Sequence, residues 1–130
     1  MTRQRSREAG ITTVEVVLTA PALLLMLMLV VQYGLVAHAQ SVARSAAEEG
    51  AAQARRFDGT EAAAAARTNT YLDDLAPTII QHRLVVAERT LTTATVSVDA
   101  DVVSLVPGFS FEVHESASGP VERYVQETGP

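Results

Sequence analysis

The hydrophobic pattern of the chain is dominated by one long uncharged stretch near the N-terminus. From Val16 to Ala43, 28 consecutive positions carry no Asp, Glu, Lys or Arg, and residues 21–31 are apolar without interruption. A helix over residues 16–36 has 21 residues. At a rise of about 1.5 Å per residue it is about 31 Å long, which is enough to cross the hydrocarbon core of a bilayer. The pattern therefore predicts a transmembrane helix within residues 11–36, in preference to a buried helix of a soluble core.

Beyond this stretch, small residues recur at the spacing of one helix face. Their separations alternate between three and one, a helical period. The stripe consists of Ala39, Val42, Ala43, Ala46, Ala47, Gly50, Ala51 and Ala54. It predicts that the helix extends over residues 37–56 and that its neighbour approaches closely. Two neighbours fit equally well: the rest of the same domain, or a helix of another subunit in an assembly. Both can apply at different lengths of one helix.

The C-terminal half predicts a second helix followed by strands. Asp58 and Glu61 have the spacing of a capping box, which predicts a second helix within residues 57–76, stopped by Pro77. After Pro77 the period changes to two, which is typical of half-buried strands. The strand candidates are residues 84–88, 95–102 and 109–114, with Pro107-Gly108 as the turn between the last two. Residues 77–130 are thus expected to form a small antiparallel β region with a polar tail, and no structure is predicted from Ser116 onward.

These elements give an α+β fold class: a long N-terminal transmembrane helix that extends into the domain, a short second helix and a small antiparallel sheet. Residues 1–10 precede the helix and are expected to be a basic leader peptide. The leader contains Arg3, Arg5 and Arg7, and the following span contains no basic residue. This asymmetry predicts a single crossing with a cytoplasmic N-terminus and an extracytoplasmic C-terminal region.

Composition excludes several functional classes. The chain has 130 residues, a formal net charge of −5, no cysteine and three widely separated histidines. Disulfides, thiolate metal sites and cysteine nucleophiles are therefore excluded. The acidic balance leaves no basic surface for a nucleic acid, so no nucleic-acid partner is expected.

Acidic pairs on the predicted strands and second helix are better explained as solvated faces than as a catalytic site. The closest groups are Asp73-Asp74, Asp99 with Asp101, and Glu112 with Glu115 beside His114. Asp99 and Asp101 alternate with apolar positions and do not belong to a Ca²⁺-loop pattern. We therefore expect no catalytic residue, no enzyme activity, no cofactor and no metal site.

Glu15 is an unusual residue because it is a carboxylate at the start of an apolar helix. An acid in mid-bilayer costs about 2.5–3.5 kcal/mol, and less near the interface. If the chain were cut between Gly10 and Ile11, Glu15 would be the fifth residue of the mature chain. It would then lie about one helical turn from the new α-ammonium group of Ile11. We expect Glu15 to pair with the ammonium group of a neighbouring subunit; the alternative is that it only reaches the lipid headgroups.

The same residues carry a resemblance to a known family. Gly10-Ile11-Thr12-Thr13-Val14-Glu15 before an apolar helix is similar to the class III signal peptide of type IV pilin-like proteins. With Thr19-Ala20-Pro21, the leucine-rich run and Tyr33-Gly34, the segment most resembles the TadE-like family, the minor pseudopilins of the Tad/Flp pilus system. The resemblance covers about a third of the chain. Glu8 and Val16-Val17 depart from the usual family residues.

The resemblance implies a non-catalytic protein of the cytoplasmic (inner) membrane. A prepilin peptidase would process it between Gly10 and Ile11, and the product would join other pilins or pseudopilins, the pilus assembly platform and membrane lipid. It would help to assemble a Tad/Flp-type pilus or secretion pseudopilus that functions in secretion or cell adhesion, and it could enter a surface pilus. The long region after the span favours a minor role over that of a major pilin.

Pro21 predicts a helix kink, because proline removes the amide that would bond to the Val17 carbonyl group. We expect the Thr19 hydroxyl group to help satisfy the freed backbone.

The alternative reading is a signal-anchored or secreted protein with a small extracytoplasmic binding domain. Ala37-His38-Ala39 before Gln40 fits a signal-peptidase site, although the apolar run is longer than that of a usual signal peptide. The mature N-terminus separates the readings: Ile11, Gln40 or the original start.

Overall fold

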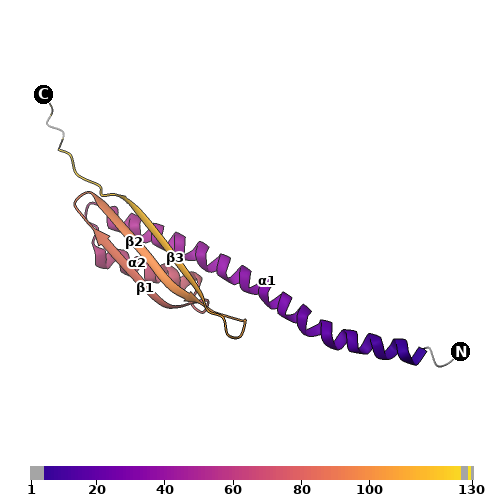
Figure 1. Ribbon diagram of the computed structural model, residues 1–130. Coiled ribbons are helices and arrows are strands. Elements are labelled where there is room, and N and C mark those ends of the chain that lie inside the picture. Colours follow the sequence, from indigo (N-terminus) through magenta and orange to yellow (C-terminus); the bar gives the residue numbers. More distant parts are fainter. Residues whose placement is uncertain (1–4, 127–128, 130) are drawn as a thin grey trace.

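The computed structural model describes residues 5–126 and 129, with side chains described at Gly10, from Thr12 to Gln126 and at Gly129. Helix α1 (Arg5–Arg55) extends far beyond a small domain at its C-terminal end (Figure 1). The domain adds helix α2 (Glu61–Leu75) and strands β1 (Ile80–Arg89), β2 (Thr93–Val102) and β3 (Phe111–Pro120). The strands form one antiparallel sheet in the order β1-β2-β3. The expected α+β class is confirmed.

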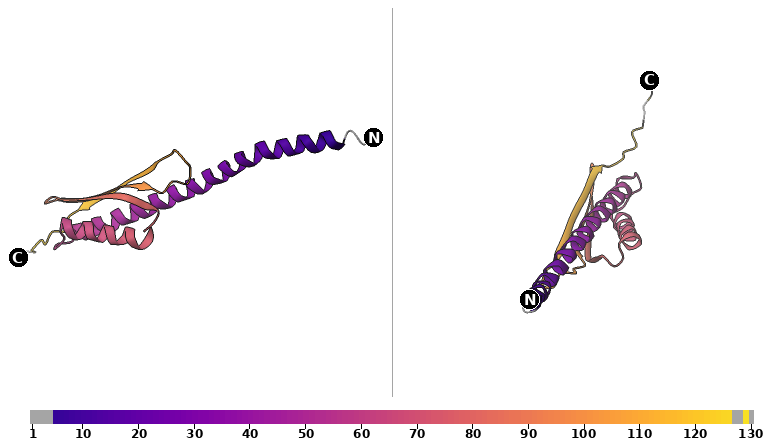
Figure 2. Two further views of the ribbon diagram at one scale, coloured as in Figure 1. Left: turned by 90° about the horizontal axis from the view of Figure 1, so that it is seen from below. Right: turned by 90° about the vertical axis from the view of Figure 1, so that its right-hand side faces the viewer.

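The domain has two layers. The C-terminal half of α1 and the whole of α2 lie on one face of the sheet (Figure 2). The small-residue stripe of α1 faces this core, together with Leu72, Val98 and Val113. Its alanines at 39, 43, 46, 47 and 54 are completely buried. The stripe therefore packs within its own domain, the first of the two neighbours that the sequence left open.

Helices α1 and α2 approach most closely at Gly50. A Cβ atom at this position would overlap the Thr68 hydroxyl group. That hydroxyl group donates a 2.9 Å hydrogen bond to the Ala64 carbonyl oxygen, so Thr68 is fully buried yet satisfied. An exposed ion pair of 2.7 Å between Arg67 and Glu49 flanks the contact. The absence of a side chain at Gly50 is what permits this helix spacing.

The start of α2 differs from the expected capping box. Thr60 is the N-cap, and its hydroxyl oxygen accepts a 3.1 Å hydrogen bond from the Ala63 amide group. The chain first makes a tight turn closed by the Gly59 amide group on the Arg56 carbonyl oxygen. Because this turn uses Asp58, α2 begins only at Glu61. The expectation that Asp58 caps the helix is wrong.

Arg89 of β1 joins the end of α1 to the sheet. Its guanidinium group donates to the carbonyl oxygens of Ala54 at 2.9 Å and Arg56 at 3.2 Å. The Glu61 carboxylate accepts a 2.9 Å bond from the Arg89 backbone amide group instead of closing a capping box. A cation at the C-terminus of a helix complements its unpaired carbonyl groups and its dipole.

Strand β3 continues past its predicted end. It pairs with β2 along its whole length, from Phe111 opposite Val102 to Pro120 opposite Thr93. Ser116 to Pro120 therefore belong to the sheet, and the expectation of a tail without structure from Ser116 is wrong for these residues. Phe109, predicted to begin the strand, lies in the preceding loop. The small polar residues at 116–119 have weak intrinsic strand preference, so the pairing with β2 decides their conformation.

Candidate membrane-spanning and assembly segment

The N-terminal half of α1 presents an apolar surface that is almost entirely exposed. Residues 12–31 are all exposed except Met28, which is half-buried. This row includes Val14, Val16, Val17, Leu18, Leu23, Leu24, Leu25, Met26, Leu27, Leu29, Val30 and Val31. Monomeric soluble proteins rarely expose a continuous apolar surface of this size. The length and apolar character of this helix fit a single-pass membrane protein.

Gly10 and Glu15 lie on the first turns of this exposed helix. Gly10 is exposed, and a Cβ atom placed on it would meet no atom within 4 Å. Ile11 belongs to α1, but its side chain lies outside the described part. Glu15 is exposed and makes no ion pair with any side chain that the structure describes. Residues 11 and 15 are about 6 Å apart along the helix axis. Cleavage at Gly10 and pairing of Glu15 with a neighbour stay predictions.

Helix α1 continues through Pro21. It curves gently along its length in Figure 2, and a local kink at Pro21 stays a prediction. The Thr19 hydroxyl group donates to the Glu15 carbonyl oxygen at 2.8 Å. The carbonyl group that loses its helical partner to Pro21 is that of Val17. Thr19 therefore does not take the role expected for it, because its side chain reaches back one turn to a different carbonyl group.

Comparison with known families gives a match that covers much of this helix. Residues 10–52 match the family model of the TadE-like proteins. Over this segment the chain is similar to TadE-like proteins. The match begins at Gly10, includes the exposed apolar surface and ends within the buried stripe of α1. No curated protein and no solved structure matches the chain.

Gln32, inside the TadE-like segment, has a role that the sequence analysis missed. Its side chain is 2% exposed. Its amide nitrogen donates to the Val103 carbonyl oxygen at 3.1 Å, and its amide oxygen accepts from the Leu105 backbone amide group at 2.7 Å. Gln32 therefore fixes the loop between β2 and β3 to α1. In the sequence, the feature that could have indicated this role is position, because Gln32 is the polar residue that ends the apolar run at 21–31.

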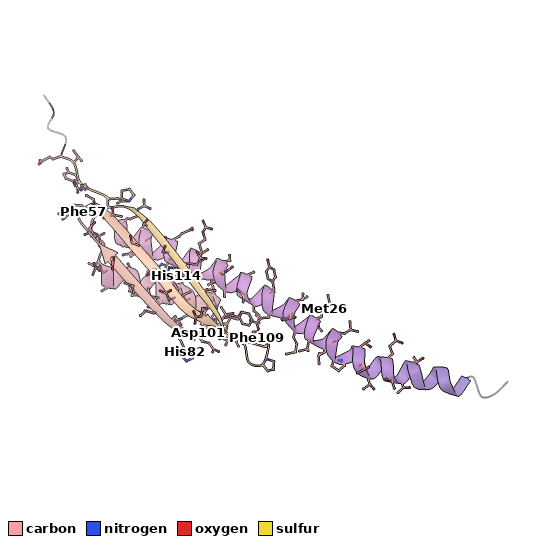
Figure 3. The ribbon with its side chains drawn as sticks, in the orientation of Figure 1. Met26, Phe57, His82, Asp101, Phe109 and His114 are labelled. Atoms are coloured by element: carbon pink, nitrogen blue, oxygen red, sulfur yellow. The ribbon has the colours of Figure 1, made fainter. Side chains whose placement is uncertain are left out.

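The face of the sheet opposite the TadE-like helix carries three of the acidic residues noted in the sequence, Asp99, Asp101 and Glu112. Figure 3 shows His82, Asp101 and His114 on this open side. His82 pairs with Asp101 at 3.2 Å, and His114 pairs with Asp99, the residue opposite it in the β2–β3 register. The two histidine side chains are largely exposed, and the two aspartate side chains are about half exposed. Within the described residues, no group of three or more His, Cys, Asp or Glu side chains is arranged to hold a metal ion. The sequence associated His114 with Glu112 and Glu115, and only the register identifies Asp99.

Proposed function

We propose that this chain is a non-catalytic minor pseudopilin of a Tad/Flp-type pilus or secretion pseudopilus. It is anchored in the cytoplasmic membrane by α1, with the N-terminus inside and the domain outside. The observation that carries the proposal is the TadE-like match from residue 10, which coincides with the uncovered apolar half of α1. The single crossing follows from the same surface, and the orientation follows from the arginines before it.

The proposed maturation step is cleavage by a prepilin peptidase between Gly10 and Ile11. The support is steric: Gly10 is exposed and has open space around its Cα, so the domain does not obstruct access to the bond. The bond lies near the N-terminal end of α1, where helices fray and the backbone can open into a protease site at little cost. The domain itself supplies no group to this reaction.

The proposed assembly step uses the Ile11 ammonium group and the Glu15 carboxylate. The Glu15 carboxylate forms no ion pair with the described side chains and lies in the first turns of the apolar surface. A neighbouring subunit's ammonium group would offset the cost of placing this charge near hydrocarbon. Since the small-residue stripe is used inside the domain, contacts with other pilins are assigned to the exposed half of α1.

The alternative is a signal-anchored or secreted protein with an extracytoplasmic binding domain. Cleavage after Ala39 would remove a core residue and place the new N-terminus, Gln40, inside α1, because Ala39 is completely buried within this helix. It would also remove Gln32 and the packing of Leu35 and Val36 against the domain. These losses favour the pilin reading. Mass spectrometry of the protein isolated from membranes tests it: a mature N-terminus at Ile11 supports the proposal, whereas Gln40 or Met1 contradicts it.

A substitution pair tests the peptidase step itself. Gly10→Val should leave the precursor uncut, because the residue before the bond must be small. Gly34→Val is the matched control, since Gly34 lies on the same helix and also has open space around its Cα. We expect Gly34→Val to mature normally in the mass spectrum. Normal maturation of Gly10→Val would contradict the assigned cleavage site.

A further inference from the structure

The loop between β2 and β3, residues 103–110, lies at the end of the sheet from which the apolar half of α1 emerges (Figure 1). Its side chains include exposed apolar groups, with Phe109 64% and Leu105 40% exposed. Figure 3 shows Phe109 beside α1 at this end of the domain. The ten residues 102–111 contain no Asp, Glu, Lys or Arg. The loop is therefore an uncharged apolar projection next to the proposed membrane helix.

Gln32 fixes the position of this loop along α1. It bonds to the backbone of both Val103 and Leu105, so the loop is held at the level of residue 32. Val106 is buried and anchors the loop from the inside. Because the contact uses backbone groups of the loop, the exposed side chains of Leu105 and Phe109 remain available to other surroundings.

The domain contacts of α1 also locate the end of the membrane span. From Gln32 onward, α1 packs against the loop and the sheet through Gln32, Leu35 and Val36. A span reaching residue 36 would draw this part of the domain into hydrocarbon. Residues 12–31 are 20 in number and span about 30 Å, the thickness of the hydrocarbon core. The span that suits the fold is therefore 12–31, and residue 32 lies at the extracytoplasmic interface.

We propose that loop 103–110 docks into the interfacial region of the leaflet from which α1 emerges, with Phe109 and Leu105 inserted among the lipid headgroups and upper acyl chains. Phe and Leu side chains insert at the boundary between headgroups and acyl chains. Tyrosine is enriched at the membrane–water interface, and Tyr33, exposed on α1 next to Gln32, lies at the same level. The occupant is lipid because the loop is continuous with the apolar surface of α1 and carries no charge. The inference rests on the membrane crossing of the proposed function. Its consequence is that the domain is held at two points and cannot swing freely on α1.

The chain contains no tryptophan, so single tryptophans can report the depth of chosen positions. Phe109→Trp tests the loop. Met26→Trp, on the exposed face of the span, is the positive control. Leu91→Trp is the matched negative control, because Leu91 is 87% exposed in the turn between β1 and β2, at the opposite end of the sheet. Each full-length variant is reconstituted in phosphatidylcholine–phosphatidylglycerol vesicles, with and without bromine on the acyl chains.

We expect Phe109→Trp to lose about half of its emission to bromine placed high on the acyl chains, and less to bromine near the chain ends. Met26→Trp should be quenched most by deep bromine, and Leu91→Trp only by aqueous iodide. If Phe109→Trp behaves like Leu91→Trp while Met26→Trp is quenched by lipid, the loop proposal is overturned and the crossing stands. If Phe109→Trp is shielded from both lipid bromine and aqueous iodide, a protein neighbour such as a second copy covers the loop, and the loop proposal is also overturned. If Met26→Trp is not quenched by lipid, the membrane crossing fails, and both proposals fall with it.

Discussion

Replacing Gln32 with alanine tests whether one buried side chain joins the domain to the membrane helix. The substitution removes two hydrogen bonds, of 3.1 Å and 2.7 Å, and leaves the Val103 carbonyl group and the Leu105 amide group without their partners. A net hydrogen bond is worth about 1 kcal/mol, and a buried group left unpaired costs about 1–3 kcal/mol. Water can reach part of this partly buried site, so we expect a loss of about 2–4 kcal/mol in the free energy of unfolding.

The assay is amide hydrogen exchange by NMR, with the full chain in detergent micelles. The reporter is the Val103 amide group, because it bonds to the Ile79 carbonyl oxygen and the substitution does not remove that bond. Its exchange should become about 30-fold faster or more, since each 1.4 kcal/mol corresponds to a factor of ten. Gln40→Ala is the control, because Gln40 is exposed on the same helix. Equal exchange rates in Gln32→Ala and Gln40→Ala would refute the reasoning.

Three further predictions concern assembly, packing and orientation. Glu15→Ala should insert and mature but fail to co-purify with other pilins, with Glu15→Gln intermediate; full surface piliation by Glu15→Ala would exclude an assembly contact. Gly50→Ala should lower the thermal midpoint of unfolding through overpacking worth about 1–3 kcal/mol, and adding Thr68→Ala should relieve part of that overpacking. The control Gly34→Ala should leave the midpoint unchanged, and equal midpoints for Gly50→Ala and Gly34→Ala would contradict the close approach of the helices. A reporter fused after Pro130 should be active only outside the cytoplasm, and cytoplasmic activity would overturn the orientation.

The sequence alone was enough for features that depend on local composition. The absence of charge over residues 16–43 predicts a membrane helix because hydrophobic length is a property of the segment itself. The change of period after Pro77 predicts strands for the same reason, since alternation is visible without knowing the partner strand. The TadE-like residues from Gly10 to Tyr33 are likewise contiguous, and the family match covers them.

Features that depend on two distant segments needed the tertiary structure. The stripe from Ala39 to Ala54 fits either of two neighbours, and only the packed domain shows that α2 and the sheet cover it. Thr60 replaces Asp58 as the helix cap because Asp58 lies inside the turn that the Gly59 amide group closes on the Arg56 carbonyl oxygen. Both outcomes depend on which surfaces meet, and a local pattern does not encode that.

Gln32 shows the same difference between what the local sequence reveals and what the tertiary structure reveals. In the sequence it is only the polar residue that ends an apolar run. In the structure its two hydrogen bonds reach residues more than 70 positions away and locate the base of the domain along α1. Local hydrophobicity determines that α1 can enter a membrane. The folded loop determines where along α1 the domain begins, because backbone groups held by a buried amide cannot move independently of the helix.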